Sequence, residues 1–496
     1  MNQTLRIRLF RFATFFLVLL FSACRQQRVE QAAVVWSANP ILITREELQE
    51  SFLLRPKFPA KLKGRQALQA QLDAMIRQKY LAWSAEKMGL DQDEKIISRL
   101  RWVRHKAMRE QLFKREISGS VRLTESELRR AFIQRNRFIS ARHLFFKTPS
   151  EASLWRQRIV NGMSFAEAAA WVYKEVDAEM AASGGKLPTF TWGDMDPGFE
   201  SAAFSLREGE LSQPVASSWG YHLILVDSIA INPMLTETDF FRDREKIERI
   251  LRKRREDSLA TIYVAKVMQG LEVRVKGDAF SFIVNQARQI RHQDDAGLPD
   301  QTPISDQEWA SLSASLQERR NQVFMTYRHG QWTLTDFIQR FQAIPPLYRP
   351  HLQHPELFES ELRHLIRDEF LNDRAEQLGL QTDPYVLKQV EEAKLDLLAA
   401  AMRRHLVAAI SVDEAEVHRY YRTHLAQDLS TPDDELWQEI RRRALAHKQD
   451  SVITAFVRHW REATPSHTDE VQLQQALQAL GGDQAAFIAV WQPPQR

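Results

Sequence analysis

The feature that most constrains the fold is a diverged duplication, found by sliding the chain along itself by about 290 residues. Apolar residues recur at helical spacing in both copies, and each helix ends at a glycine. The matched positions are Leu72, Met75, Ile76, Tyr80, Leu81, Ala85, Gly89 and Leu90 in the first copy, and Leu362, Leu365, Ile366, Phe370, Leu371, Ala375, Gly379 and Leu380 in the second. A second block, residues 123–128, parallels residues 412–417 in near register, which favours duplication over chance similarity between helices. The sequence therefore predicts two related helical modules.

Side-chain caps mark where several of these helices are expected to begin. Thr44 and Glu47 form a capping box at the start of the first copy, and Thr335 is expected to begin the second. Thr124 and Asp413 each have a glutamate three residues later, so both are predicted N-caps of a further helix.

A segment of different character, residues 184–226, lies between the two copies. It has the length of about one strand–helix–strand unit. Its spaced positions are Gly184, Gly185, Leu187, Phe190, Gly193, Met195, Phe199, Glu200, Ala203, Phe204, Leu206, Gly209, Glu210, Ser212, Pro214, Val215, Gly220, Tyr221 and His222. Upstream, residues 142–146 place a histidine before an apolar run, and Ser164 with Glu167 forms a capping box. This series resembles the core of the parvulin-type peptidyl-prolyl cis/trans isomerases, and the resemblance covers roughly residues 137–230.

The resemblance implies an α+β domain that isomerises X–Pro peptide bonds. Rotation about such a bond loses amide resonance, a barrier of about 18–20 kcal/mol. A catalyst must therefore bind the twisted amide better than either planar form. No bond is made or broken, so no metal, nucleotide or other cofactor is implied. The implied partners are unfolded or proline-containing client polypeptides.

The resemblance also assigns residues to a binding slot. Leu187, Met195 and Phe199 would form an apolar slot for the proline ring. Ser217 would supply a hydroxyl beside this pocket. Without the motif, the three apolar residues would be interpreted as ordinary core residues.

Two histidines and one acidic residue complete the implied site. His143 and His222 correspond to the family's two central histidines, on neighbouring strands. Their implied role is a mutual hydrogen-bond network that fixes tautomers and positions the site, because the reaction needs no net proton transfer. The family's aspartate-or-cysteine position is assigned to Asp177 from its spacing before Gly185, with Glu175 as the alternative for a shifted register.

The N-terminus predicts export. Basic residues precede a largely apolar run, residues 12–21, which is too short to span a bilayer as a mature helix. Two small residues then lead to Cys24, a pattern similar to a bacterial lipoprotein signal in which the cysteine is acylated and ties the protein to the membrane. An ordinary secretory peptide is the alternative, because Phe21 stands where leucine is usual. Arg25 after the cysteine favours the outer membrane, so the predicted location is the periplasmic face of the cell envelope.

Composition narrows the classes of protein to which this chain can belong. The single cysteine excludes an internal disulfide after export, so packing must hold the fold. A net charge of +4 is small for 496 residues and does not support nucleic-acid binding. The basic run at residues 252–255 lies among acidic residues in a helical pattern and is interpreted as a solvated helix face, with contact to anionic lipid or a client as the alternative. His351, His354 and His364 are interpreted as structural or exposed residues rather than metal ligands.

The predicted fold class is multidomain and mainly α, with one α+β parvulin domain and two diverged helical chaperone-like modules. This order resembles periplasmic foldases of the SurA and PrsA type, in which helical segments on both sides of a parvulin domain form a chaperone module. The expected divisions are a lipoprotein signal peptide at 1–23, a tether at 24–36, the first helical copy at 37–136, the parvulin domain at 137–230, helices completing the first module at 231–289, a linker region at 290–330, the second helical copy at 331–463 and a partly mobile tail at 464–496.

Three functions are compatible with these features. The first is an exported, lipid-anchored foldase that isomerises X–Pro bonds and holds unfolded clients. The second is a catalytically silent parvulin-fold chaperone, and the third is a binding protein of an envelope assembly. Lys186 and Pro188 replace the aspartate and glycine usual around Leu187. Proline fixes φ and removes a donor, so a reshaped loop beside the slot would favour the silent alternative.

Overall fold

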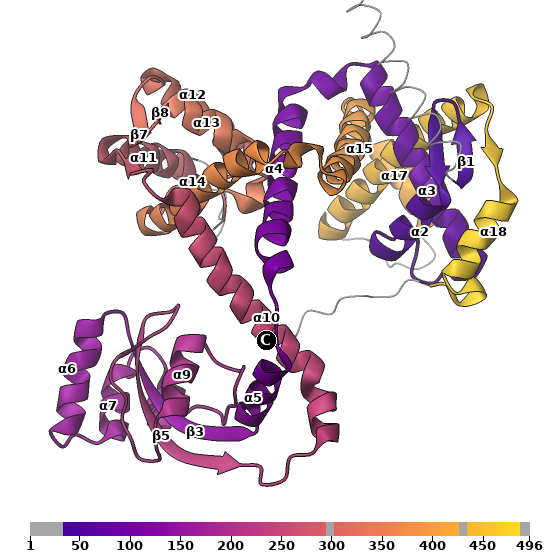
Figure 1. The fold of residues 1–496 in the computed structure, drawn as a ribbon. Coiled ribbons are helices and arrows are strands. Elements are labelled where there is room, and N and C mark those ends of the chain that lie inside the picture. The colour runs from indigo at the N-terminus through magenta and orange to yellow at the C-terminus, as the bar shows by residue number, and fades with distance from the viewer. Residues whose placement is uncertain (1–32, 294–301, 426–433, 487–496) are drawn as a thin grey trace, which may run out of the picture.

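The computed structural model describes residues 33–293, 302–425 and 434–486. Figure 1 shows two helical lobes above an arm that contains a sheet, and the long helix α10 (Glu237–Met268) runs between the arm and the lobes. The chain is thus mainly α-helical with one α+β domain, as predicted. The expected signal peptide and Cys24 lie outside the described residues. Within the described ranges, no helix is both long enough and apolar enough to cross a membrane.

The two copies share one order of elements: a β-hairpin, a short helix and two long helices. The first copy contains β1 (Val34–Ala38), β2 (Ile41–Thr44), α2 (Arg45–Leu54), α3 (Gly64–Lys87) and α4 (Glu94–Glu116). The second contains β7 (Val323–Tyr327), β8 (Gly330–Thr333), α13 (Leu334–Gln342), α14 (Pro355–Gln377) and α15 (Pro384–Val407). Gly89 and Gly379 adopt nearly the same left-handed conformation, with φ of 75° and 74°, between the two long helices. The repetition therefore extends upstream of the matched residues to the hairpins.

The predicted N-caps hold at Thr44, Thr124 and Asp413 and shift at the start of the second copy. At Thr44 only half of the predicted capping box forms, because the Glu47 carboxylate pairs with Lys79 instead. Thr44 accepts a hydrogen bond from the Glu47 N–H at 3.1 Å. Thr124 and Asp413 form capping boxes for α5 (Glu125–Arg135) and α16 (Glu414–His424). The prediction for Thr335 was wrong, because α13 starts at Leu334 and its cap is Thr333. Asp336 closes that capping box from three residues further on, a role for which aspartate serves as well as glutamate.

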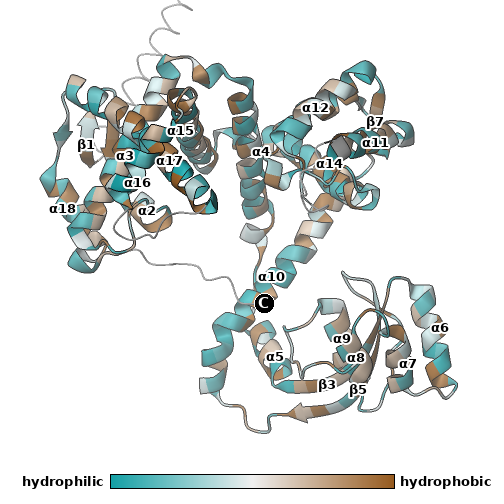
Figure 2. Ribbon diagram, turned by 180° about the vertical axis from the view of Figure 1, so that it is seen from behind, coloured by the Kyte–Doolittle hydropathy of each residue, from teal (hydrophilic) through white to brown (hydrophobic). Residues whose placement is uncertain are grey.

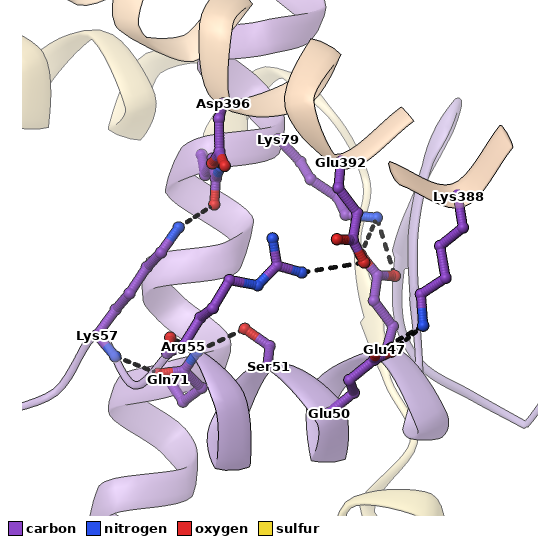
Figure 3. Close-up of polar contacts among 11 residues, drawn as sticks. Glu47, Glu50, Ser51, Arg55, Lys57, Gln71, Lys79, Lys388, Glu392 and Asp396 are labelled. Carbon is purple, nitrogen blue, oxygen red and sulfur yellow. Dashed lines mark hydrogen bonds and ion pairs between the residues drawn. The ribbon is translucent and has the colours of Figure 1, made fainter. Parts of the chain in front are cut away.

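Each copy packs its last long helix against the other copy. Helix α15 lies along α3, so Leu398 and Met402 are buried with Leu72 and Tyr80 in one cluster, the first core. Helix α4 in turn packs on α14. Figure 3 shows polar contacts at the first of these interfaces, where Lys388 of α15 pairs with Glu50 of α2 and Glu392 pairs with Arg55 at 3.1 Å. The two copies thus form one interlocked body.

The expected divisions at 231–289 and 290–330 differ from the structure. Helices α11 (Gly277–Gln293) and α12 (Asp306–Leu316) both contribute to the second core, formed around the hairpin of the second copy. Ile283 and Trp309 are buried there against Phe337, because both helices present apolar faces to that hairpin. The first module is therefore not completed by α11, and the described residues 302–330 are not a linker.

The expected tail at 464–496 also differs, as far as residue 486. Strand β9 (His467–Thr468) pairs antiparallel with β1 of the first copy. Helix α18 (Glu470–Ala479) buries Leu473 and Leu477 in the first core, beside residues of α17 (Asp434–Ala463). The first core therefore joins sequence from both ends of the described chain.

The α+β domain is a small antiparallel sheet with helices on both faces. The strands have the order β3 (Arg137–Phe146), β5 (Tyr221–Ile231) and β4 (Val215–Ala216). Single bridges at Phe190 and Lys186 pair a further segment with β3. The helices are α6 (Pro149–Val160), α7 (Phe165–Val172), α8 (Ala178–Ala182) and α9 (Pro197–Ser205). Helices α6 and α7 contribute to one hydrophobic cluster and α9 to a second, so the strands lie between two small cores.

Helices α5 and α10 attach this domain to the rest of the chain. Figure 2 shows α10 as largely hydrophilic, yet its buried Phe240 and Ile247 pack with Phe132 and Trp192. Arg254 of the basic run forms an ion pair of 2.8 Å with the buried Glu200 of α9.

The basic run at 252–255 is therefore only partly a solvated face. Arg255 pairs with Glu127 of α5 at 2.6 Å, whereas Arg252 and Lys253 pair within α10 itself. Two of the four cations thus hold neighbouring elements.

Candidate active site

Two histidines face each other on adjacent strands of the α+β domain. His222 of β5 lies opposite Phe145, two positions from His143 of β3, so both imidazoles lie on the same face of the sheet. Their Nδ1 atoms are 3.3 Å apart, and the ring planes differ by 21°. One ring must donate and the other accept, which requires at least one neutral imidazole.

The histidine pair is extended at both ends by hydroxyl groups. The Ser217 hydroxyl lies 2.7 Å from Nε2 of His222. The Tyr173 hydroxyl lies 3.4 Å from Nε2 of His143 and 3.4 Å from its carbonyl oxygen. One arrangement connects all four side chains with one proton per contact: Tyr173 donates to His143, His143 to His222, and His222 to Ser217. That arrangement requires both rings to be neutral.

Burial favours these neutral forms. Loss of solvent, with a smaller effect of the neighbouring His222, lowers the pKa of His143 to about 4. Burial also lowers the pKa of His222, against the opposing effect of Asp196. For Tyr173, burial raises the pKa of the phenol to about 12. The network is therefore uncharged at neutral pH, which suits a site that binds an uncharged amide.

An apolar surface lies against the two rings. Phe199 of α9 presents edge-to-face contacts to them, with ring centroids 5.2 Å from His222 and 6.0 Å from His143. Leu187 and Met195 pack in the same cluster as Phe199. Phe199 is only 3% exposed, whereas Leu187 and Met195 are partly exposed. The side chains expected to form the slot therefore lie together, with Phe199 as its innermost member.

Asp196 fixes the loop that carries Ser217. One carboxylate oxygen accepts from the Gly198 N–H at 2.9 Å and caps α9, while the other accepts from the Ser218 hydroxyl at 2.8 Å. Partial burial alone would raise the pKa of this carboxyl, but the hydrogen bonds from Ser218 and the α9 backbone lower it below its ordinary value. Sequence reasoning missed both Asp196 and Tyr173. An aspartate followed by proline at the first helical position was a usable signal for Asp196.

Asp177 lies apart from the histidine pair. It is exposed and caps α8, accepting from the Met180 N–H at 2.9 Å. Its negative charge adds to the rise in the pKa of Tyr173, so it reaches the network only through that tyrosine. Glu175, the alternative, is also exposed. Of the residues assigned from the sequence, the structure brings together all except Asp177.

A close backbone approach explains one glycine of the motif. Gly185 has φ of +78°, and a Cβ atom there would lie 2.5 Å from the His143 carbonyl oxygen. The His143 N–H donates to the Gly185 carbonyl at 2.8 Å. Only glycine allows this contact, which sets the position of His143.

The departures at Lys186 and Pro188 leave Leu187 in the apolar cluster of Phe199. The N–H groups on either side of the proline remain bonded to β3, from Leu187 to Ala141 at 2.9 Å and from Phe190 to Ile139 at 3.1 Å. Pro188 is exposed and occupies a position between these bonds. The expected reshaping of the loop therefore does not displace Leu187 from its cluster.

The three histidines outside the domain do not form a metal site with other ligands. His351 lies 2.7 Å from a carboxylate oxygen of Glu361 through Nδ1. Among the described residues, no group of three or more histidine, cysteine, aspartate or glutamate side chains is placed to hold a metal ion.

Comparison with known proteins assigns the segment that carries this geometry. Residues 147–228 match the rotamase family, described as the PPIC-type PPIase domain. This segment is a parvulin-type peptidyl-prolyl isomerase domain. The chain is also similar to the parvulin of Nitrosopumilus maritimus. That match is 34% identical and covers 18% of this chain and 97% of the other, with a TM-score of 0.17.

The similarity to curated proteins extends beyond the parvulin domain. The foldase protein PrsA of Caldanaerobacter subterraneus is 26% identical over 222 residues, which span 41% of this chain and 72% of that protein. The foldase protein PrsA of Oceanobacillus iheyensis is 30% identical over 179 residues, or 36% of this chain and 59% of that one. The chain thus resembles proteins named as foldases over a longer stretch than the rotamase match covers.

Proposed function

We propose that this protein is an exported, lipid-anchored foldase that isomerises X–Pro bonds and holds unfolded clients. The observation that carries the catalytic part is the neutral, hydrogen-bonded pair of His143 and His222 beside the slot of Leu187, Met195 and Phe199. These features meet the two needs of the reaction, an apolar grip on proline and polar groups near the turning carbonyl.

In this proposal the protein lowers the barrier by binding the twisted amide. The slot takes the proline ring out of water, and the amide loses resonance as it rotates. His143 and His222 act as catalytic residues that line the site without net proton transfer, and Ser217 orients His222. Asp177, the acidic residue assigned from the sequence, caps α8 apart from the histidine pair and takes no part in this step.

An apolar groove supports the proposed holding of clients. It lies where α4, α10 and α14 meet and has a volume of about 450 Å³. Its apolar residues include Phe113 of α4, Ile117 directly after that helix, Val264 of α10 and Leu371 of α14. Phe113 is 37% exposed, so the groove offers apolar surface to a client segment.

The experiment for the catalytic part is an isomerisation assay on X–Pro peptides with the mature chain. We expect acceleration by the wild type, a loss of at least tenfold in kcat/KM for Phe199→Ala and a smaller loss for Met195→Ala, since methionine is adaptable packing. Phe204→Ala, on the same helix, controls for packing loss, and circular dichroism confirms folding. A folded wild type that accelerates no peptide contradicts the proposal.

The alternative is a catalytically silent chaperone or envelope-assembly binding protein. The position of Asp177 away from the histidines favours it. In that case the slot binds X–Pro peptides without accelerating them, which the same assay combined with a binding measurement distinguishes.

The proposed membrane location depends on acylation of Cys24. Several acyl chains on one cysteine anchor a protein stably, whereas a single chain gives only marginal binding. We expect wild-type protein in the membrane fraction, with the outer membrane favoured, and Cys24→Ser protein in the soluble fraction. Equal membrane retention of both proteins contradicts the lipid anchor.

A further inference from the structure

Helix α4 of the first copy meets α14 of the second through a small network of polar side chains. At its centre lies Asn372 of α14, which is only 3% exposed. The Asn372 carbonyl oxygen accepts from Arg109 of α4 at 2.7 Å. The Asn372 amide nitrogen lies 3.2 Å from a carboxylate oxygen of Glu369 and 3.1 Å from Nδ1 of His105 on α4. These four side chains, the α4–α14 network, thus connect the two copies.

The network fixes the protonation state of His105. A guanidinium group only donates hydrogen bonds and a carboxylate only accepts them, so Arg109 and Glu369 hold the Asn372 amide in one orientation. The amide nitrogen therefore donates to Nδ1 of His105, which accepts only while it carries no proton. The remaining ring proton lies on Nε2, which faces Glu376 at 3.7 Å. A second proton on the ring would set two donors against each other and break the contact.

The surroundings of His105 oppose that second proton. Burial lowers the pKa of His105 to about 4, while Glu376 opposes this effect and three arginines of α4 add to it. On the adjoining face of α4, Met108 is buried with the apolar Val386 of α15. The charged groups around the ring are Arg101, Arg104 and Arg109 of α4, Asp368, Glu369 and Glu376 of α14, and Asp336 and Arg340 of α13.

The direction of this pKa change makes the network sensitive to acid. A ring released from the network returns towards the ordinary histidine value of about 6.5. Between about pH 6.5 and 4 the open arrangement therefore binds more protons than the closed one, so the closed arrangement loses stability as the pH falls. The ratio of open to closed molecules rises about twentyfold between pH 7 and pH 5.

The network lies beside the apolar groove proposed to hold clients. Arg109 and Asp368 line both that groove and the polar cavity at the network, and they pair at 3.4 Å. Leu112 of α4, which lines the groove, is buried with Met108 and with Ala375 of α14. Separation of the two helices would therefore expose apolar side chains at the groove.

We infer that protonation of His105 releases α4 from α14 and opens the groove, so that this protein holds unfolded clients more tightly in acid. The inference rests on the proposed function and assigns regulation by pH to the client groove. The slot and the histidine pair of the parvulin domain take no part in it.

The test uses the full mature chain at pH 7 and pH 5 with two readouts. One is the fluorescence of the apolar dye bis-ANS, and the other is the dissociation constant of a labelled unfolded polypeptide that contains no proline. We expect the wild type to bind more dye and to hold the polypeptide at least threefold more tightly at pH 5. His105→Gln, which can still accept from Asn372 but takes up no proton, should lose most of both changes. Asn372→Asp should lose them as well, because its carboxylate accepts from a protonated His105.

His364→Gln is the matched control, because His364 is exposed on α14 itself. Circular dichroism at pH 7 confirms that each variant is folded. A wild type without an acid response, or a full response in His105→Gln or Asn372→Asp, would overturn the inference. A dye response that depends on His105 without tighter binding of the polypeptide would contradict the proposed client groove and leave the release of α4 in place.

Discussion

At the scale of single residues, the low pKa values of His143 and His222 link the stability of the parvulin domain to pH. Both pKa values lie below the ordinary histidine value in the folded chain, that of His143 at about 4. Between about pH 6.5 and 4 the unfolded chain therefore binds more protons, so stability falls as the pH falls through this range. We expect His143→Phe to weaken this dependence, measured by urea unfolding at pH 7, 5.5 and 4. An identical pH dependence in the variant would contradict the assignment.

Much of the site could be predicted at this scale, because the motif fixes residue types at fixed spacing. His143, His222 and Phe199 lie together as that spacing implies. The sequence could not place Asp177, because a carboxylate one turn beyond Tyr173 can either cap the next helix or turn towards the site. Its hydrogen bond to the α8 backbone shows that capping prevails.

At the scale of elements, the ion pair between the buried Glu200 of α9 and Arg254 of α10 connects the parvulin domain to the long helix α10. Arg254→Ala would leave Glu200 buried with its partner missing, although the Gly193 N–H still donates to it at 2.6 Å. We expect a loss of about 2–3 kcal/mol in the free energy of unfolding. Arg252→Ala is the matched control, since its pair with Glu248 on the same helix contributes about 0.3–0.5 kcal/mol. Equal effects of the two substitutions in thermal unfolding would refute the role of Arg254.

Elements were predicted better than their packing. Helical spacing and terminal glycines located α3 and α14, because these signals are local. Which core α11, α12 and α18 join depends on how their apolar faces fit against hairpins that are distant in sequence. Ile283 of α11 is buried in the second core in this way, and Leu473 of α18 in the first. The cap at Thr333 was missed because its answering residue is Asp336 rather than glutamate.

At the scale of the whole molecule, the two ends of the described chain share one core. Leu473 of α18 is 2% exposed in the first core, whereas Val471 on the same helix is 65% exposed. We expect Leu473→Ala to cost about 2–5 kcal/mol of stability and to increase proteolysis of the N-terminal hairpin. Val471→Ala should leave both unchanged. A harmless Leu473→Ala would mean that residues after 464 behave as a tail.

The two ends of the parvulin domain lie close together, so the domain can be removed and the chain rejoined between α5 and α10. Asn136 and Asn232 lie at the two ends of the domain, and the Asn232 N–H donates to the Asn136 carbonyl at 3.0 Å. A short linker can therefore join them. The deletion also removes Trp192 from the cluster that α5 and α10 share, so circular dichroism must confirm that the variant is folded. This deletion variant separates holding from isomerisation.

The most direct test of the account is the refolding of a client whose slow step is an X–Pro isomerisation, followed for both rate and yield. Such a step takes tens to hundreds of seconds without catalysis, so acceleration is easily measured. We predict that the wild type raises the rate and the yield, while Phe199→Ala and the deletion variant raise only the yield. Acceleration by the folded Phe199→Ala protein equal to that of the wild type, or no acceleration by the wild type, would contradict the account.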